Sequence, residues 1–254
     1  MRYIAEKWRE ILVFNNLDSH EKIWALQAEW FEEPNHCRGG WSGVSRIELK
    51  LPEGGIVGAF LKRQENHVTR TLRNPIKGVL TFSREFEVLR VFNKHKIPSL
   101  DLILFDQWEE SGCRRGCIIT EELAGYLPLS SEEYRMGGDF LTSADQKARL
   151  FVKIAALMHL THQQGFKHGC FYPKHIFVKQ LPEGDVDLRV IDLEKVKKFF
   201  CKKRAAFRDL DTLLRHSNGW SEDDKLAFFK VYQGEYVLKE LSKQLWKKLC
   251  NRKK

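Results

Sequence analysis

The alternation of hydrophobic and polar positions predicts a β-rich first part of the chain. In GVSRIELKL, at 43–51, the apolar Ile47, Leu49 and Leu51 alternate with polar neighbours. After a Pro-Glu-Gly-Gly turn, Val57, Ala59 and Leu61 do the same in IVGAFLK, at 56–62. A period of two is typical of strands with one buried face, so this segment predicts a β-hairpin. The runs LDLILFDQWE, at 100–109, and CRRGCIITEEL, at 113–123, predict a second antiparallel pair.

Helical spacing of apolar residues appears in three other segments. Residues 18–31 predict a helix with Asp18 or Ser19 as its cap, and a second helix over roughly 83–95 ends before Pro98. Residues 144–165 form a long amphipathic pattern that stops at a glycine, and from there the chain reads as mainly helical, apart from the short strand VDLRVID.

This order predicts an α+β fold with a small antiparallel β-rich lobe followed by a larger helical lobe. We place the first lobe at residues 1–122 and the second at 123–254, with the join in the loop-like segment around 121–130. The two lobes are expected to form one folded unit.

Composition fits a globular protein of the cytosol. Hydrophobic residues make up 43% of the 254 positions and charged residues 30%, and no apolar run approaches the roughly 18 residues of a membrane span. The amphipathic start of the chain carries Glu6 and Glu10, so we do not interpret it as a secretory signal. The six cysteines form no C-x-x-C pair, which fits a reducing compartment.

The net charge of +9 is concentrated in two basic blocks. They consist of Lys195, Lys197, Lys198, Lys202, Lys203 and Arg204, and of Lys247, Lys248, Arg252, Lys253 and Lys254. Such blocks favour anionic partners, although a solvated helix face explains each of them equally well. Phe199 and Phe200 inside the first block favour a membrane surface. Charge alone also allows nucleic acid, but no recognition-helix or stacking pattern supports it, and we expect none.

Several residues have the chemistry of a phosphate site. The run Arg38 to Gly43 precedes a strand, and its Gly39, Gly40, Ser42 and Gly43 would let backbone N–H groups approach a phosphate, or would simply form a hairpin turn. Lys62 ends an alternating strand, where its ammonium could neutralise nucleotide phosphates.

Two carboxylates complete this set. Glu85 lies on the helix after the strand of Lys62, on a face that could return and pair with the ammonium. Asp192 ends the apolar strand VDLRVID, a position suited to a Mg²⁺ ligand.

The segment KHGCFYPKHIFV, with VIDLEK after it, has the outline of a kinase catalytic loop. The kinase pattern is H-R-D-L-x-x-x-N followed by D-F-G, and its first Asp takes the proton of the acceptor. Here His168 stands at the first position, Cys170 at that of the catalytic Asp and His175 at that of the Asn. Asp192 opens the D-L-E that replaces D-F-G.

Taken in order, these features resemble the lipopolysaccharide kinase family, the Kdo/WaaP group, and most closely its InaA-like branch. The similarity rests on HGCFYPKHIFV at 168–178, IDLEKVKK at 191–198, RDLDTLLRH at 208–216 and DDKLAFFKVYQG at 223–234, and covers nearly all of the chain after Gly39. The resemblance implies a bilobal protein-kinase-like fold, ATP and Mg²⁺ as cosubstrates, and heptose or Kdo of the lipopolysaccharide core as acceptor.

The resemblance also implies a role for single residues. Lys62 matches the phosphate-binding Lys, Glu85 its helix partner and Asp192 the metal ligand. Glu121 and Leu123 match the hinge whose backbone binds adenine, and His168 matches the His that shapes the loop.

The departures from the family pattern concern the base and the second metal. Cys170 is a weak base because an ordinary thiol is mostly protonated at neutral pH, and Glu194 is the second candidate if its segment stays extended. His175 would bind the second metal only as neutral imidazole, which suits Mn²⁺ better than Mg²⁺. We therefore expect a slow kinase, with a pseudokinase that binds nucleotide or scaffolds partners at the inner membrane as the alternative.

A zinc site is a further interpretation of the same region. His159, His162, His168, Cys170 and His175 fall within 17 positions. We give this interpretation less weight, because the kinase order assigns structural roles to His162 and His168, and His159 is expected to be an ordinary helix residue.

Overall fold

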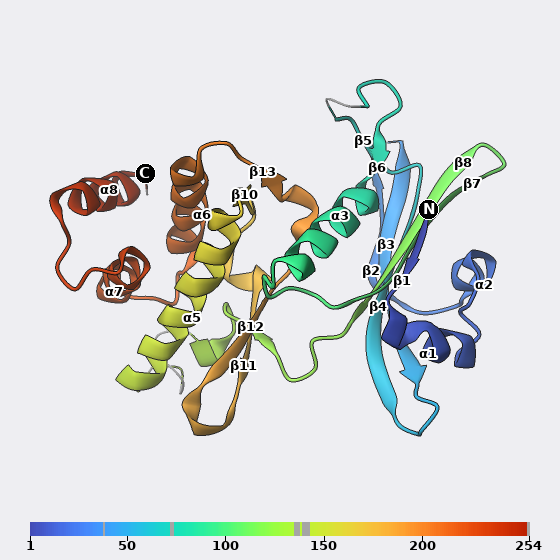
Figure 1. Ribbon diagram of the computed structural model, residues 1–254, viewed down its shortest axis with the longest axis horizontal. Helices are drawn as coiled ribbons and strands as arrows, with labels where there is room; N and C mark the ends of the chain where they lie inside the picture. Colours follow the sequence, from blue (N-terminus) through green and yellow to red (C-terminus); the bar gives the residue numbers. More distant parts are fainter. Residues whose placement is uncertain (38, 72–73, 135–137, 139–142, 253–254) are drawn as a thin grey trace. The chain divides into compact units, whose positions relative to one another are not determined.

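The chain folds into two compact units (Figure 1). The computed structural model describes residues 1–37, 39–71, 74–134, 138 and 143–252. The first unit comprises Met1–Val91 and Leu100–Ala124, and the second Phe92–Ser99 and Gly125–Lys254. The predicted boundary at 122/123 lies close to the junction after Ala124. Residues 92–99 belong to the second unit because the Phe92 ring packs on Phe166 and the Pro98 carbonyl accepts from the Val190 N–H.

A six-stranded antiparallel sheet forms the centre of the first unit, in the order β1-β7-β8-β4-β3-β2. The predicted hairpin is present as β3 and β4, and the second predicted pair as β7 and β8. The strands are β1 (Arg2–Ile4), β2 (Trp30–Cys37), β3 (Gly40–Lys50), β4 (Ile56–Glu65), β7 (Leu102–Glu110) and β8 (Cys113–Glu121). The short strands β5 (Val68–Thr69) and β6 (Val79–Leu80) pair separately before α3 (Thr81–Lys94), which matches the helix predicted over 83–95.

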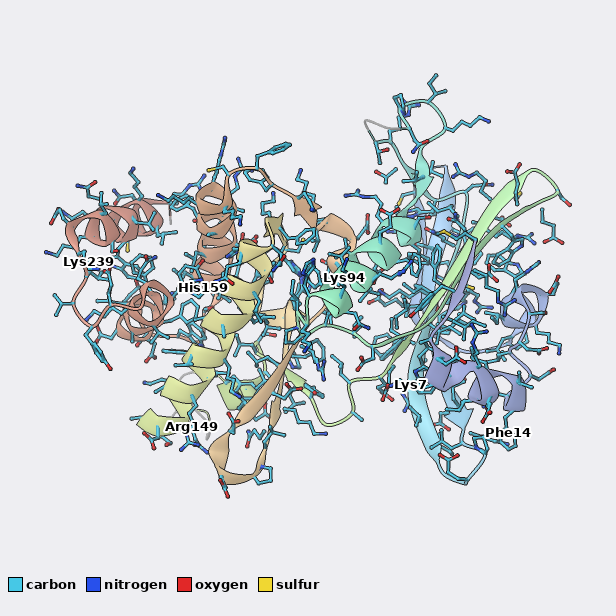
Figure 2. All side chains as sticks on the ribbon, in the orientation of Figure 1. Lys7, Phe14, Lys94, Arg149, His159 and Lys239 are labelled. Atoms are coloured by element: carbon cyan, nitrogen blue, oxygen red, sulfur yellow. The ribbon has the colours of Figure 1, made fainter. Side chains whose placement is uncertain are left out.

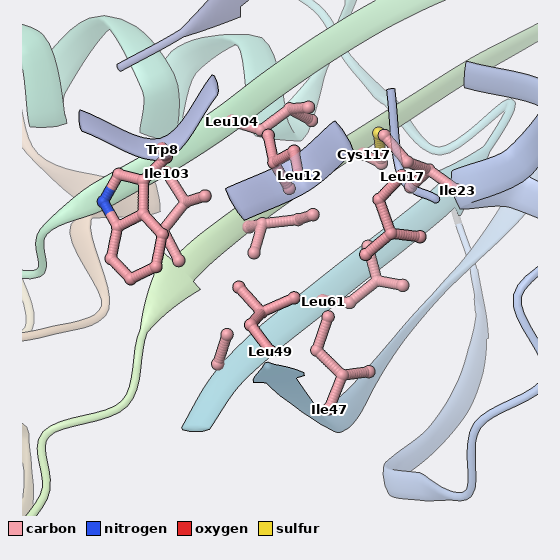
Figure 3. Packing of buried hydrophobic residues seen from close by; sticks show 12 residues of the cluster. Trp8, Leu12, Leu17, Ile23, Ile47, Leu49, Leu61, Ile103, Leu104 and Cys117 are labelled. Atoms are coloured by element: carbon pink, nitrogen blue, oxygen red, sulfur yellow. The ribbon is translucent and has the colours of Figure 1, made fainter. Parts of the chain in front are cut away.

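The two faces of this sheet have different partners because successive side chains of a strand point to opposite sides. Leu61 of β4 is buried in a core that also takes in Leu49 of β3 and Leu12 of α1 (Arg9–Phe14) (Figure 3). Lys62, the next residue, points to the other face, where α3 contributes Glu85 and stacks Phe86 on Phe105 of β7.

The helix predicted over 18–31 is much shorter in the structure. Ser19 caps α2 (His20–Ala25) as predicted, but the chain turns extended at Leu26 and enters β2 at Trp30. Tertiary contacts override the helical pattern here, since the guanidinium of Arg63 donates to the carbonyl oxygens of Trp24 and Leu26 at 3.1 and 2.9 Å.

The second unit is mainly helical. The predicted long helix is α5 (Ala144–Gln163), and it packs against α6 (Lys202–His216) and α7 (Glu222–Gln233). Its remaining elements are α8 (Glu240–Asn251), β9 (Leu127–Pro128), β10 (Phe166–Lys167), β11 (Ile176–Gln180), β12 (Val186–Val190) and β13 (Lys197–Lys198). Strands β12, β11 and β9 form one small sheet, and β10 pairs with β13.

The loop between β10 and β11, residues 168–175, contains the kinase-like segment. Within the described residues, no helix is both long enough and apolar enough to cross a bilayer.

Candidate functional site

The predicted ion pair between Lys62 and Glu85 is present in the first unit. Lys62 Nζ lies 2.7 Å from Glu85 Oε1, and the Glu85 side chain is almost fully buried while that of Lys62 keeps partial access to solvent. A hydrogen bond to a buried carboxylate holds the ammonium group in one position. The pair therefore presents an oriented ammonium on the α3 face of the sheet.

The predicted hinge residues lie at the end of β8 and just beyond it. Glu121 ends β8 opposite Ala59 of β4, its N–H donates to the Asp101 carbonyl, and its carboxylate pairs with Lys7 at 3.3 Å. Leu123 lies just beyond the last strand residue. Thr120, one residue before Glu121, shares the face of Lys62, and its buried Oγ1 has no hydrogen-bond partner among the described residues. The role of Glu121 and Leu123 in binding adenine stays a prediction.

The glycine run is a hairpin turn between β2 and β3, and Ser42 and Gly43 lie inside β3. A Cβ on Gly40 would come within 2.0 Å of the Glu65 carbonyl oxygen, and one on Gly43 within 2.7 Å of the Trp30 ring. The protein fills the space on the Cβ side of both glycines, which accounts for glycine at these positions in the hairpin. The approach of their backbone N–H groups to a phosphate stays a prediction. Gly39 has φ +82° and open space around it. The predicted phosphate-binding roles of Gly39 and Ser42 stay predictions, and Arg38 lies outside the described residues.

His168 in the second unit is completely buried and has partners on both ring nitrogens. Nε2 lies 3.1 Å from the Ile191 carbonyl oxygen and therefore carries the proton, so that Nδ1 accepts from the Cys170 N–H at 3.2 Å. Burial lowers the pKa of His168 from 6.5 to about 4. This neutral ring shapes the loop, as the resemblance implied. These contacts make His168 a positioning residue of the loop, and its predicted part in catalysis stays a prediction.

Asp209 of α6 holds the start of the same loop, a role that was not predicted for it from the sequence. Its fully buried carboxylate accepts from the backbone N–H groups of His168 and Gly169 at 2.8 and 2.9 Å. The His162 Nε2 of α5 lies 3.1 Å from the same carboxylate. The sequence signal that could have identified Asp209 was an acidic residue among the apolar positions of an amphipathic helix.

The Cys170 side chain is only 2% exposed. Burial raises the pKa of the thiol, and the carboxylate of Asp192 raises it further, while Lys195 acts in the opposite direction. The thiol therefore stays protonated at neutral pH. This environment disfavours Cys170 as a general base.

His175 and Asp192 lie next to each other at the end of the loop. His175 Nδ1 is 2.9 Å from the Cys170 carbonyl oxygen and 3.4 Å from Asp192 Oδ2. With two acceptors nearby, Nδ1 carries a proton, so only Nε2 could bind the metal predicted for this residue. In this arrangement His175 orients the Asp192 carboxylate.

Asp192 itself has a left-handed backbone conformation, with φ 60° and ψ 57°. This conformation is uncommon for any residue other than glycine, although aspartate tolerates it better than most. The next three residues form a 3₁₀ turn, Leu193–Lys195. The segment is therefore not extended, and the reason for placing Glu194 on the same side as Asp192 is wrong.

The histidines considered for zinc have other partners. His159, labelled in Figure 2, stacks on Tyr232 and places Nε2 2.9 Å from its carbonyl oxygen, and His162 contacts the Tyr232 hydroxyl. In the part of the chain that the structure describes, no three His, Cys, Asp or Glu side chains form a group that could hold a metal ion. The geometry gives no support to a zinc site.

We predict that Asp209→Asn lowers the unfolding free energy by roughly 3 kcal/mol, because one buried backbone N–H would face an amide NH₂ instead of a carboxylate. Urea denaturation measures this loss. Asp211→Asn in the same helix is the matched control, since Asp211 pairs with the exposed side chains of Arg215 and Arg252, and its loss is expected to be below about 1 kcal/mol. Equal losses in the two variants would contradict the assignment.

We further predict that His168 makes stability fall in mild acid. The unfolded chain takes up a proton at this ring below about pH 6.5, whereas the folded chain does so only near pH 4. The contribution of the neutral His168 ring to the free energy of unfolding is therefore complete above pH 6.5 and is lost as the pH falls. At pH 5 the loss amounts to about 2 kcal/mol. Urea denaturation at pH 7 and pH 5 should show a smaller pH dependence for His168→Gln, and parallel curves would refute the prediction.

Comparison with known proteins places this arrangement in a family. Residues 21–232 match the model of the lipopolysaccharide kinase (Kdo/WaaP) family. Protein InaA of Escherichia coli (strain K12) is 26% identical over 199 residues, which are 78% of this chain and 88% of InaA.

A solved structure of WaaP in complex with acyl carrier protein matches with a TM-score of 0.69 at 19% sequence identity, covering 100% of this chain and 98% of that chain. This similarity confirms the predicted fold class, with an antiparallel β-rich N-terminal part and a helical C-terminal part. The chain belongs to the lipopolysaccharide kinase (Kdo/WaaP) family.

Proposed function

We propose that the protein is an ATP-dependent phosphotransferase whose acceptor is a hydroxyl group of a lipopolysaccharide core sugar, heptose or Kdo. The observation that carries this proposal is the ion pair of Lys62 with the buried Glu85. Burying a carboxylate and holding an ammonium beside it costs desolvation energy, and phosphate binding gives the pair a use.

The residues of each unit fit a nucleotide with a divalent cation. Lys62 would hold the nucleotide phosphates, and Asp192, whose carboxylate is about one third exposed, would hold Mg²⁺ or Mn²⁺. The bound nucleotide supplies the phosphoryl group, and the cation neutralises charge on it. One carboxylate fits Mg²⁺, which takes most of its ligands from phosphate and water.

Phosphoryl transfer without an acidic base is expected to be slow but measurable. Positioning and charge neutralisation supply most of the acceleration, and general-base help adds roughly 10²–10⁴-fold. The protonated Cys170 thiol does not provide that help. The acceptor hydroxyl would then lose its proton late, to solvent or to the transferred phosphate oxygens.

The test is transfer of label from γ-labelled ATP to purified lipopolysaccharide core in the presence of Mg²⁺ or Mn²⁺. We expect slow labelling by the wild type and at least a hundredfold loss in Asp192→Ala, because the variant cannot hold the cation. Cys170→Ser should keep the wild-type rate within about threefold, since the thiol is not the base.

Two results would count against the proposal. Labelling that survives Asp192→Ala unchanged would show that another residue holds the metal or that a contaminant transfers the label. A Cys170→Ser rate that falls as far as that of Asp192→Ala would make Cys170 the base.

Lys62→Met should weaken ATP binding in calorimetry whether or not transfer occurs, and so serves to test the nucleotide site separately.

The alternative function is a pseudokinase that binds nucleotide or scaffolds partners at the inner membrane. The observation that favours it is the buried, protonated thiol at the position of the catalytic Asp. Saturable ATP binding by the wild type, without label transfer to any core preparation, would support this alternative.

We also propose that the first basic block binds an anionic glycolipid or the anionic inner leaflet. Lys197, Lys198, Lys202, Lys203 and Arg204 are exposed, and within the described residues none of them forms an ion pair with a carboxylate. Phe200 is fully exposed beside them, whereas Phe199 is covered by the cationic groups of Lys167 and Arg208. Exposed aromatic and basic side chains together suit a lipid surface.

The second block supports this surface less well. Arg252 lies 3.4 Å from Asp211 and over the Phe207 ring, so it has intramolecular partners. Lys253 and Lys254 lie outside the described residues.

Sedimentation with lipid vesicles tests the first block. We expect the protein to bind phosphatidylglycerol vesicles more tightly than phosphatidylcholine vesicles. Replacing Lys197 and Lys198 by Glu should weaken binding by at least tenfold, because each basic residue near the surface contributes about 1 kcal/mol. Phe200→Ser should weaken binding several-fold, whereas Phe31→Ser, at an exposed position of β2, should not. Equal binding of all variants would contradict the proposal.

A further inference from the structure

A cysteine and a histidine of the first unit form a hydrogen-bonded pair that the proposed kinase chemistry does not use. Cys37 Sγ, at the end of β2, lies 3.1 Å from His67 Nε2. The thiol is exposed, whereas the imidazole is only 6% exposed. On the far side of the ring, His67 Nδ1 lies 3.1 Å from the Thr81 hydroxyl.

A third group fixes the orientation of this ring. Thr81 Oγ1 lies 2.7 Å from the side-chain amide of Gln64, which is best satisfied with its nitrogen toward Thr81 and its oxygen toward the Phe82 N–H. A nucleophile, a ring within hydrogen-bond reach and a group that orients the ring are the three parts of an activated nucleophile.

Gly40 brings the two side chains together. Cys37 is the register partner of Gly40 in the β2–β3 hairpin. A Cβ on Gly40 would come within 2.0 Å of the Glu65 carbonyl oxygen and 2.6 Å of the backbone nitrogen of His67. Only glycine therefore allows the end of this hairpin to lie against residues 65–67, and this close approach places Cys37 beside the imidazole.

The imidazole is placed to assist the reaction of the thiol in either direction of the hydrogen bonds around the ring. If Nδ1 donates to Thr81, Nε2 takes the thiol proton and then donates to the thiolate. If Thr81 donates to Nδ1, Nε2 already carries the proton that it donates to the thiolate. In both cases a proton on Nε2 faces the sulfur when it attacks, at the 3.1 Å hydrogen-bond distance.

Charged groups on the neighbouring strands have partners of their own. Glu65 of β4 pairs with Arg115 of β8 at 2.6 Å, and the Arg114 guanidinium donates to the carbonyl oxygens of Lys77 and Gly78. Among the described residues, the imidazole is the group that faces the thiol at hydrogen-bond distance.

We propose that Cys37 is the activated thiol of this chain and the site at which it forms a mixed disulfide with a low-molecular-weight disulfide such as glutathione disulfide. The Cys37 thiolate attacks one glutathione sulfur, a bond forms between the two sulfurs, and the original disulfide bond breaks. The second glutathione leaves as a thiolate and takes up the proton that Cys37 released. Cys37 is oxidised, and the departing glutathione sulfur is reduced.

The test compares Cys37 with Cys201, which is also exposed, in the same folded protein. Limited alkylation with iodoacetamide at several pH values between 6 and 8.5, followed by peptide mass spectrometry, gives the rate at each cysteine. At pH 7 we expect Cys37 to react about tenfold faster than Cys201.

His67→Gln should reduce the advantage of Cys37 over Cys201 to within about threefold. Gly40→Ala, which pushes the hairpin away from His67, should act in the same direction. Incubation of the wild type with glutathione disulfide should place the adduct on Cys37 before Cys201.

Equal alkylation rates of Cys37 and Cys201 in the wild type would overturn the proposal, and this comparison does not depend on the folding of any variant. An advantage that survives unchanged in folded His67→Gln would also overturn it. Thermal unfolding of each variant identifies those that are folded.

Discussion

The carboxylate of Asp209 is the contact on which the arrangement of the second unit depends. It joins three segments that are distant in the sequence, since it accepts from the backbone of the His168 loop, lies beside His162 of α5 and belongs to α6. A buried carboxylate is stable only where donors surround it. Its burial therefore holds the loop at one end, while the His168 ring holds it at Ile191, and together they determine where Cys170, His175 and Asp192 lie.

Local periodicity was enough to predict the first unit well. The alternation around Leu61 and Lys62 gave both strands of the β3–β4 hairpin and assigned the two side chains to opposite faces. The helical spacing of α3 then placed Glu85 toward Lys62, and the pair lies at 2.7 Å. Predictions of this kind succeed because the direction of a side chain follows from its position in a strand or helix.

The errors of the sequence analysis concern contacts that depend on tertiary structure. The end of α2 is determined by Arg63, which lies almost forty positions further along and donates to the carbonyl of Trp24. The contacts of the glycines at 40 and 43 with the Glu65 backbone and with Trp30 also come from other segments, and the local pattern does not reveal them. Asp209 was missed for the same reason, since its donors come from another segment.

Two features of the structure cost free energy without an evident gain for folding. Asp192 adopts a left-handed conformation, which costs roughly 1–2 kcal/mol for an ordinary residue, and Glu85 is buried as one half of an ion pair. A protein that only scaffolds partners has no physical need for either. Strained residues and buried charges gather where a ligand uses them. Their presence on the residues that would hold phosphate and metal favours retained nucleotide chemistry over a pure scaffold, even though a buried thiol stands where the family has its base.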